Sequence, residues 1–483
     1  MIEHFPEISV DVAIVGAGFS GTAVAVNLAR HAQSPLRIAL IERRPEFGRG
    51  VAYGTADPQH LMNVPAGKMS LYPDRPEHFV SWLQNRAELW RRLGITEITP
   101  DSFLPRLLYG AYLQAQLATI QNTDSYLTLY RGEVTDLVPQ KDGSFTLEID
   151  RQSPLIARQV VLALGNFAPG DPPTRTRGFH RSPRYLDDPW SEDTQQKLSG
   201  PGPVVILGSG LTCLDLIVSL CSSRKRDPIY VISRRGLFPL PHANASNSPY
   251  TGFLDPNELP PGPLPLLRAL RQEIIRAAAS GIDWRVVLDS LRPHTQAIWR
   301  NWSVEEKRRF IRHLRAFWEP HRHRADPRVL AIKEEMERAN RLMCFRGRVV
   351  EITEHASSLT VKFRSPGTTR EQSLEAVYVV NCTGPECNYH KLKDTLVVQL
   401  FARGIIHPDP LFLGLEAGPG GAIQSVAGQR VPNLYTLGSP QKGMLYETTA
   451  VPEIRTQAKE LALRLIRNAK PQEAPAVAGS YVI

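Results

Sequence analysis

The chain has 483 residues, of which 42% are hydrophobic and 22% are charged, so the composition excludes a wholly disordered protein and predicts two or three domains. Lysine and arginine outnumber the acidic residues by 57 to 48, and a net charge of +9 suits a phosphate-bearing ligand. The arginines are scattered along the sequence, so we expect no nucleic-acid partner.

The N-terminal residues lack the basic and apolar regions of a signal peptide. No apolar stretch reaches the roughly 20 residues that a membrane-spanning helix needs. The five cysteines include no C-x-x-C pair. We therefore expect a cytoplasmic protein with reduced thiols, no metal site and no membrane partner.

The chain opens with the pattern of a strand–helix–strand unit. A buried strand is predicted at residues 8–15, a helix at 20–32 and a second buried strand at 36–42. The second strand ends at Glu42, where a carboxylate can accept hydrogen bonds from a ribose diol.

Three glycines separate the first strand from its helix in the G-x-G-x-x-G spacing. Gly16 permits a tight turn, Gly18 lets a pyrophosphate approach the backbone, and Gly21 lets the helix pack against the strand. The helix N-terminus then presents free N–H groups to an anion. This context predicts a dinucleotide site, whereas the alternative is a glycine-rich turn without a ligand.

Less regular segments follow this unit. Residues 46–76 read as a long ordered loop, a type of loop that is usually functional. Further elements are expected in this order: helices at 77–94 and 104–120, then strands at 126–138, 144–150 and 157–165. The proline-rich segment 166–185 marks an expected domain boundary.

A second strand–helix–strand unit begins at Pro203 and repeats part of the glycine pattern. Gly208 and Gly210 hold the first two positions, and Cys213 takes the third. The helix is expected to start near Leu211, and the unit's second strand spans 228–236.

The residues at the end of that strand differ from those of the first unit. Ser233, Arg234 and Arg235 stand where a carboxylate would bind a bare 2′-hydroxyl. A guanidinium can bind a 2′-phosphate in a bidentate manner, so this unit favours NADPH over NADH. The alternative is a surface turn with solvated arginines.

The remainder of the sequence divides into a helical part and a mixed part. Residues 257–343 are expected to be mainly helical and carry many arginines. Strands are predicted at 347–353, 359–364 and 375–384, and a final helix at 451–469.

Together these segments resemble bacterial flavoproteins with two dinucleotide-binding domains, related to lysine and ornithine N-hydroxylases and more remotely to flavin-containing monooxygenases. The resemblance covers nearly the whole chain and is carried by segments such as VAIVGAGFSG, HLMNVPAGKMS, VVILGSGLTCLD, ISRRGLFP and GMLYETTAVPEIR. It implies an α/β fold with two Rossmann-like domains. In this division an NADPH-binding domain with a helical insertion, 171–369, interrupts an FAD-binding domain formed by 1–170 and 370–470, and 471–483 forms a flexible tail.

The resemblance also implies roles for particular residues. The first glycine turn and Glu42 would hold the ADP half of FAD, while Asn63 and Met69 would lie near the isoalloxazine. Gly438 would lie near the ribityl chain. It is followed by Ser439 where many relatives have an aspartate.

Three further candidates each have two interpretations. The run from His321 to Arg324 suits an anion-binding or structural role better than a metal site. Arg106 and Tyr109 would position an acidic substrate or lie on a helix surface. Glu447 would lie near the flavin or satisfy a loop.

The leading hypothesis is an FAD-dependent oxidoreductase reduced by NADPH that acts as a monooxygenase. It would hydroxylate a small amine or amino acid through a flavin hydroperoxide. The most specific form of this hypothesis places the hydroxyl group on a nitrogen atom of the substrate. Two alternatives stay open: an NADPH:acceptor oxidoreductase without oxygenation, and a non-catalytic flavin-binding regulator. The pattern identifies no catalytic side chain and leaves the substrate and the oligomeric state open.

Overall fold

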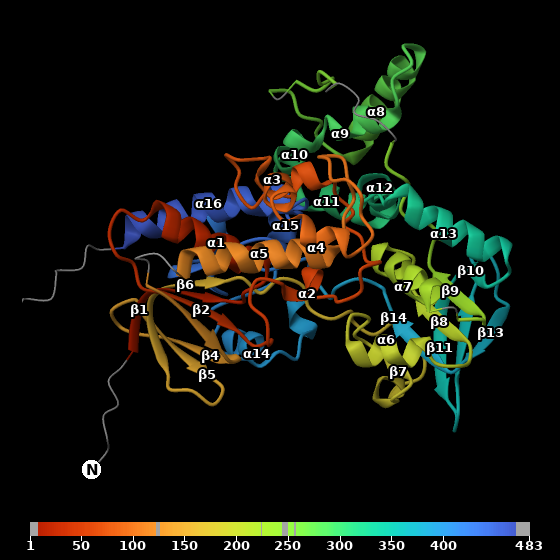
Figure 1. Ribbon diagram of the computed structural model, residues 1–483, viewed down its shortest axis with the longest axis horizontal. Coiled ribbons are helices and arrows are strands. Elements are labelled where there is room, and N and C mark those ends of the chain that lie inside the picture. Colours follow the sequence, from red (N-terminus) through yellow and green to blue (C-terminus); the bar gives the residue numbers. More distant parts are fainter. Residues whose placement is uncertain (1–7, 122–125, 224, 244–249, 256, 470–483) are drawn as a thin grey trace, which may run out of the picture.

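The computed structural model consists of two α/β lobes that lie side by side, with a group of helices above them (Figure 1). It describes residues 8–121, 126–223, 225–243, 250–255 and 257–469. The expected tail at 471–483 lies outside the described residues. No helix in the described ranges is long and apolar enough to cross a membrane.

The first lobe is built on an eight-stranded sheet with the order β15-β16-β6-β1-β2-β3, to which β5 and β4 are added antiparallel at β6. The strands β16, β6, β1, β2 and β3 are parallel to one another. The bounds are β1 (Ile8–Val15), β2 (Ile38–Glu42), β3 (Leu127–Arg131), β4 (Val134–Pro139), β5 (Phe145–Ile149), β6 (Leu155–Leu162), β15 (Ala422–Gln424) and β16 (Arg430–Thr436). Because β6 pairs with both β1 and β16, the chain returns to this sheet after building the second lobe.

Helices cover both faces of the first sheet. The helices α1 (Phe19–His31), α5 (Arg106–Gln121) and α16 (Val451–Asn468) pack together on one face, and α14 (Thr395–Ala402) packs on the other. The core on the first face includes the fully buried rings of Tyr109 and Tyr112.

The helix expected at 77–94 is two helices, α3 (His78–Gln84) and α4 (Ala87–Arg91). The chain leaves the helical conformation at Arg86, whose φ is −139°. The indole N–H of Trp90 donates to the carbonyl of Leu83 at 2.9 Å and thereby stabilises the corner. Two short helices complete this lobe: α2 (Gly50–Tyr53) and α15 (Lys442–Leu445).

The second lobe contains a five-stranded parallel sheet with the order β10-β9-β8-β14-β7. Its strands are β7 (Tyr185–Leu186), β8 (Val204–Leu207), β9 (Ile229–Ser233), β10 (Leu342–Arg346) and β14 (Tyr378–Asn381). Helices α6 (Glu192–Ser199), α7 (Leu211–Ser222) and α13 (Pro327–Arg338) belong to the same lobe. Because β14 pairs with β8, this sheet continues past residue 370, where the first domain was expected to resume.

A three-stranded antiparallel sheet packs on the second lobe. It consists of β11 (Arg348–Glu354), β12 (Leu359–Arg364) and β13 (Glu371–Ala376). The buried side chains of Val361 and Phe363 join Val205 and Leu207 of β8 in one hydrophobic cluster.

The helical segment expected within 257–343 is confirmed and lies above both lobes (Figure 1). Its helices are α8 (Pro263–Ala279), α9 (Trp284–Asp289), α10 (Thr295–Asn301), α11 (Val304–Arg309) and α12 (Arg315–Arg322). Trp299 of α10 stacks on Tyr446, with 4.6 Å between the ring centroids. The helical segment therefore packs against the part of the chain that has returned to the first lobe.

Candidate functional site

In the turn between β1 and α1 the backbone passes so close to the end of β6 that glycine is required. Gly16 has a φ of +101°, and a Cβ at this position would collide with the carbonyl oxygen of Ala163 at the end of β6. A Cβ on Gly21 would overlap the carbonyl oxygen of Gly16. No side chain caps α1 at Gly18, so its first N–H groups are free to face an anion.

Glu42 lies beside this turn and is 7% exposed. One carboxylate oxygen accepts from the backbone N–H of Ala17 at 2.8 Å, and the other from the N–H of Arg44 at 2.9 Å. Each oxygen keeps a second acceptor position, so the carboxylate can still accept from a ribose diol.

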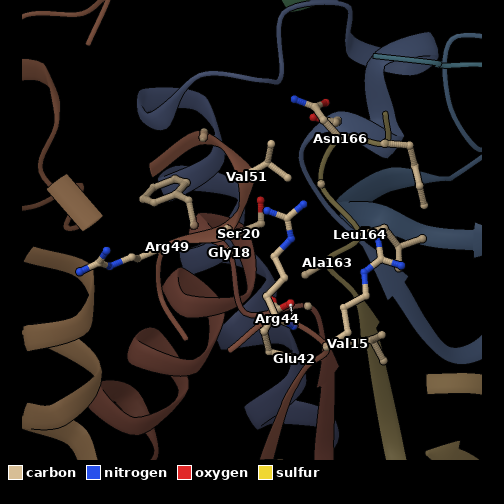
Figure 2. Close-up of a pocket in the computed structure, with 18 of the residues that line it drawn as sticks. Val15, Gly18, Ser20, Glu42, Arg44, Arg49, Val51, Ala163, Leu164 and Asn166 are labelled. Atoms are coloured by element: carbon tan, nitrogen blue, oxygen red, sulfur yellow. Dashed lines mark hydrogen bonds between the residues drawn. The ribbon is translucent and has the colours of Figure 1, made fainter. Parts of the chain in front are cut away.

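We call the cavity in front of this turn the first cavity (Figure 2). Gly16, Gly18 and Glu42 line it, whereas Gly21 packs beneath the turn. Ser439 lines this cavity as well, while the neighbouring Gly438 is not among its lining residues. The N–H of Gly438 donates to the side chain of Gln457 at 3.0 Å, so this glycine is positioned by α16.

A second hollow, the central cavity, lies between the lobes and contains both Asn63 and Met69 in its wall. It continues from the first cavity, because the two share the lining residues Arg43, Arg44, Val51, Ala52, Tyr53, Asn166, Phe167, Thr449 and Val451. A ligand as long as a dinucleotide can therefore extend from the glycine turn into the space between the lobes.

Ion pairs form much of the central cavity's wall. Arg322 makes a bidentate pair with Glu447, at 2.9 to 3.1 Å, and Arg292 makes another with Glu453, at 2.7 and 3.0 Å. Arg324 pairs with Asp289. The Arg324 pair links two parts of the helical segment. The other two pairs link the helical segment to Glu447, just before α16, and to Glu453 in the first turn of α16.

Arg322 and Arg324 of the run His321–Arg324 thus form structural ion pairs, which agrees with the structural interpretation of this run. Among the described residues no group of three histidine, cysteine or acidic side chains could hold a metal ion. Glu447 lines the central cavity, as a residue near the flavin would, and it is also held by Arg322, as a residue that stabilises a loop would be. Features of both interpretations are therefore present.

Lys68 differs from these arginines because it makes no ion pair within the described parts of the chain. Its side chain lines the central cavity near Arg292, Arg322 and Arg324. Burial lowers the pKa of Lys68, Asp289 opposes this shift, and the neighbouring arginines add to it. No sequence pattern singled out this lysine, although it belongs to the segment HLMNVPAGKMS.

Arg106 and Tyr109 occupy different environments although both lie on α5. The Arg106 guanidinium lines the central cavity, but it is held by Asp215 of α7 at 2.8 Å and lies over the ring of Trp190. Tyr109 is fully buried in the core, so neither of its two interpretations is correct.

The turn between β8 and α7 repeats the geometry of the first turn. Gly208 has a φ of +103°, and a Cβ there would collide with the carbonyl oxygen of Cys382. No side chain caps α7 at Gly210. Cys213, in the third position, is fully buried, and burial raises the pKa of its thiol.

The second cavity lies in front of this turn. It is lined by the predicted residues Gly208, Gly210, Ser233, Arg234 and Arg235. It adjoins the central cavity, with which it shares Leu211, Thr212, His323, Cys382, Gly384 and Pro385.

Two arginines that no sequence pattern singled out join Arg234 in the second cavity. They are Arg315 of α12 and Arg348 of β11. Burial lowers the pKa of Arg234, and repulsion from Arg315, Arg348 and Arg235 lowers it further. This accumulation of positive charge suits a phosphate.

All five cysteines are free, which excludes a disulfide in the structure as it stands. Cys382 lines both the central and the second cavities, and burial raises the pKa of its thiol. A thiol held protonated in this way is a poor nucleophile at neutral pH.

Residues 13–167 match the model of the FAD-NAD(P)-binding family. No curated protein sequence matches the chain significantly.

Solved structures show the same fold over nearly the whole chain. The ornithine N-hydroxylase of Kutzneria sp. 744 is 17% identical, with a TM-score of 0.66 and coverage of 96% of this chain and 100% of that one. The L-lysine 6-monooxygenase of Pseudomonas syringae is 16% identical, with a TM-score of 0.66 and coverage of 95% and 100%. The bacillithiol disulfide reductase of Staphylococcus aureus is 14% identical, with a TM-score of 0.57 and coverage of 96% and 100%.

Proposed function

We propose that this chain is an FAD-dependent oxidoreductase that is reduced by NADPH. The observation that carries the proposal is the junction of the three cavities. Each glycine turn opens into its own cavity, and both cavities adjoin the central one. Such an arrangement lets a hydride donor held at one turn reach a ring system held by the other.

The first cavity fits the ADP half of FAD. Gly16 and Gly18 leave room for a pyrophosphate beside the uncapped start of α1, and Glu42 has acceptor positions left for the ribose. Asn63 and Met69 would then lie beside the isoalloxazine in the central cavity. Bound FAD would supply the chemistry of accepting a hydride and passing electrons to oxygen or another acceptor.

The second cavity fits NADPH for a parallel reason. The uncapped start of α7 would face the pyrophosphate, and Arg234 and Arg235 would bind the 2′-phosphate. Ser233 would lie beside the same ribose. The parallel β8–α7–β9 unit presents all of these residues at the carboxyl edge of the sheet, where ligands bind in such folds.

Within this class we propose a monooxygenase acting on a small amine or amino acid, with N-hydroxylation as its specific form. The fold shared with an ornithine N-hydroxylase and an L-lysine 6-monooxygenase supports this choice. The free cation of Lys68 would orient the carboxylate of an amino acid in the central cavity. The pairs of Arg322 and Arg292 keep the wall in place and leave Lys68 free for the substrate.

The shared fold with a disulfide reductase supports a second candidate less well, because reduction of a disulfide uses a reactive thiol. Two cysteines line the cavities, Cys382 and Cys387, and they form no disulfide. Burial raises the pKa of the Cys382 thiol, which makes it a poor nucleophile for disulfide exchange. A non-oxygenating NADPH:acceptor oxidoreductase is therefore the remaining alternative.

The test is the ratio of hydroxylated product to NADPH consumed in air. FAD-loaded protein is supplied with NADPH and a panel of diamines and basic amino acids, and product is detected by mass spectrometry. We expect product with one added oxygen atom for at least one compound. If NADPH oxidation yields hydrogen peroxide alone with every compound, while a quinone acceptor is reduced rapidly, the acceptor oxidoreductase is correct and oxygenation is not.

A further inference from the structure

A further cavity, which we call the arginine cavity, lies next to the second cavity. It is enclosed by the start of α12, the ends of β9 and β10, and the turn at 365–368 between β12 and β13. Four arginines line both cavities: Arg234, Arg235, Arg315 and Arg348. Three more line the arginine cavity alone: Arg312, Arg346 and Arg364.

The positive charge of this cavity is almost uncompensated. Arg315 pairs with Glu319 at 3.4 Å, and Glu319 is the sole acidic residue among the described residues of the wall. Its carboxylate also accepts from the Tyr446 hydroxyl at 3.0 Å and contacts His323 at 3.1 Å. The other six arginines make no ion pair within the described ranges of the chain, although Arg235 lies over the ring of Phe317.

A single 2′-phosphate does not account for this number of cations. A phosphate monoester carries up to about two negative charges at neutral pH and is commonly bound by one or two guanidinium groups. NADPH in the second cavity would take the shared arginines nearest Ser233. Arg312, Arg346 and Arg364 lie outside that cavity and would keep their charges unpaired.

The shape of the site favours a small ligand over a nucleic-acid strand. The arginines come from three separate parts of the chain and line one hollow. These parts are α12 with the residues before it, the ends of β9 and β10 in the five-stranded sheet, and the three-stranded sheet. A strand of nucleic acid would instead need a continuous groove that follows its backbone.

We infer that the arginine cavity is a second anion site, which takes a small ligand carrying two or more phosphate groups. It is distinct from the cofactor cavity, but the two share four arginines. A ligand bound here would lie near the 2′-phosphate and would therefore weaken the binding of NADPH more than that of NADH. The binding site itself does not depend on the proposed redox function.

Tripolyphosphate is a suitable probe, and its binding is measured by calorimetry with and without saturating NADP⁺. We expect one tripolyphosphate to bind in both conditions, with lower affinity when NADP⁺ is present. The double variant R312A/R364A should lose at least about tenfold in tripolyphosphate affinity and keep its NADP⁺ affinity. The double variant R271A/R338A removes two exposed arginines elsewhere and should bind like the unchanged protein.

Three results would overturn the inference. Saturating NADP⁺ could abolish tripolyphosphate binding, which would mean one shared site. The two double variants could lose affinity equally, which would mean unspecific attraction. A single-stranded oligonucleotide could bind in the same place more tightly than tripolyphosphate. If NADP⁺ itself fails to bind, the proposed function is contradicted, and the comparison of the two double variants still tests this site.

Discussion

At the scale of single residues, the structure separates charges that hold the fold together from charges that are free to bind a ligand. Arg322 and Arg292 are taken by Glu447 and Glu453, whereas Lys68 and Arg234 have no acidic partner within the described chain. A free cation in a cavity costs less to pair with a ligand than a cation that must first leave a carboxylate.

The substitution R234A should weaken NADPH about 10- to 100-fold, because a charge-assisted hydrogen bond to the 2′-phosphate is lost. NADH lacks this phosphate, so its binding should change by less than about twofold. Stopped-flow reduction of the flavin at varied NADPH and NADH concentrations measures both. The exposed Arg338 provides the matched control as R338A, and equal losses for the two nucleotides would contradict the assignment.

The substitution K68M should raise the KM of an amino-acid substrate about tenfold, since the ammonium that would bind the carboxylate is removed. The corresponding amine without a carboxylate should keep its KM in the variant. Steady-state oxygen consumption with both compounds measures the difference. An equal rise for both compounds would assign Lys68 a structural role instead.

The residues that could be predicted from the sequence are those whose role depends on near neighbours. Gly16, Gly18 and Glu42 lie within one strand–helix–strand unit, and all three line the first cavity. Arg315 and Arg348 reach Arg234 from distant parts of the chain, and no local pattern indicates that meeting.

At the scale of elements, the two strand–turn–helix units are the best predicted parts of the molecule. Their buried strands are continuous apolar runs, and their glycines mark the turns, so β1, β2, β8 and β9 lie close to their predicted positions. The helix at 77–94 was predicted as one element, because the break at Arg86 depends on the contact of Trp90 with Leu83.

The two turns should respond separately to the same change. In G208A the new Cβ meets the Cys382 carbonyl, which should slow reduction by NADPH at least about tenfold while FAD remains bound. In G16A the Cβ meets the Ala163 carbonyl, so FAD itself should be lost. The absorbance of bound flavin and its rate of reduction measure the two effects.

Gly281 offers a control for backbone strain alone. It has a φ of +72°, and no atom lies within 4 Å of the position that a Cβ would take there. G281A should therefore retain both the flavin and its reduction by NADPH. Loss of flavin in G208A would contradict the separate roles of the two turns.

At the scale of the whole molecule, the contacts between the lobes include a buried histidine, His60. His60, from the loop before α5, lies with its ring nitrogens 2.7 Å from the Thr55 hydroxyl and 2.8 Å from the Ser219 hydroxyl of α7. Burial lowers the pKa of His60 to about 4, and Arg106 lowers it as well, whereas Asp57 opposes the shift. The histidine is therefore neutral in the folded protein at neutral pH.

Because the pKa of His60 is lowered in the folded protein, the stability of the contact between the lobes depends on pH. The unfolded chain binds a proton near pH 6.5 and the folded chain near pH 4, so the stability contributed by neutral His60 is present above pH 6.5 and is lost as the pH falls to about 4. The loss amounts to about 3 kcal/mol. Urea unfolding at pH 7.5 and pH 4.5 should show a smaller difference for H60Q than for the unchanged protein, and an identical difference would contradict the assignment.

The general architecture could be anticipated from the resemblance, including the return of the chain to the first sheet through β16. The strand order of the second sheet could not be predicted from the sequence. β14 is an apolar run that suits either sheet, and its pairing with β8 is decided by packing far along the chain. The proposed division into domains at residues 170 and 370 remains a prediction, although β14 of the second sheet lies beyond residue 370.

The proposed function requires that the two glycine turns hold two different dinucleotides whose reactive ends meet in the central cavity. The visible spectrum of the purified protein after incubation with FAD, followed by anaerobic addition of NADPH, examines both parts of this requirement in one experiment. We expect about one FAD per chain and bleaching of the flavin by NADPH, with R234A bleaching much more slowly at the same concentration. A folded protein that takes up no FAD, or whose bound FAD is not reduced by NADPH, would show that the requirement is not met.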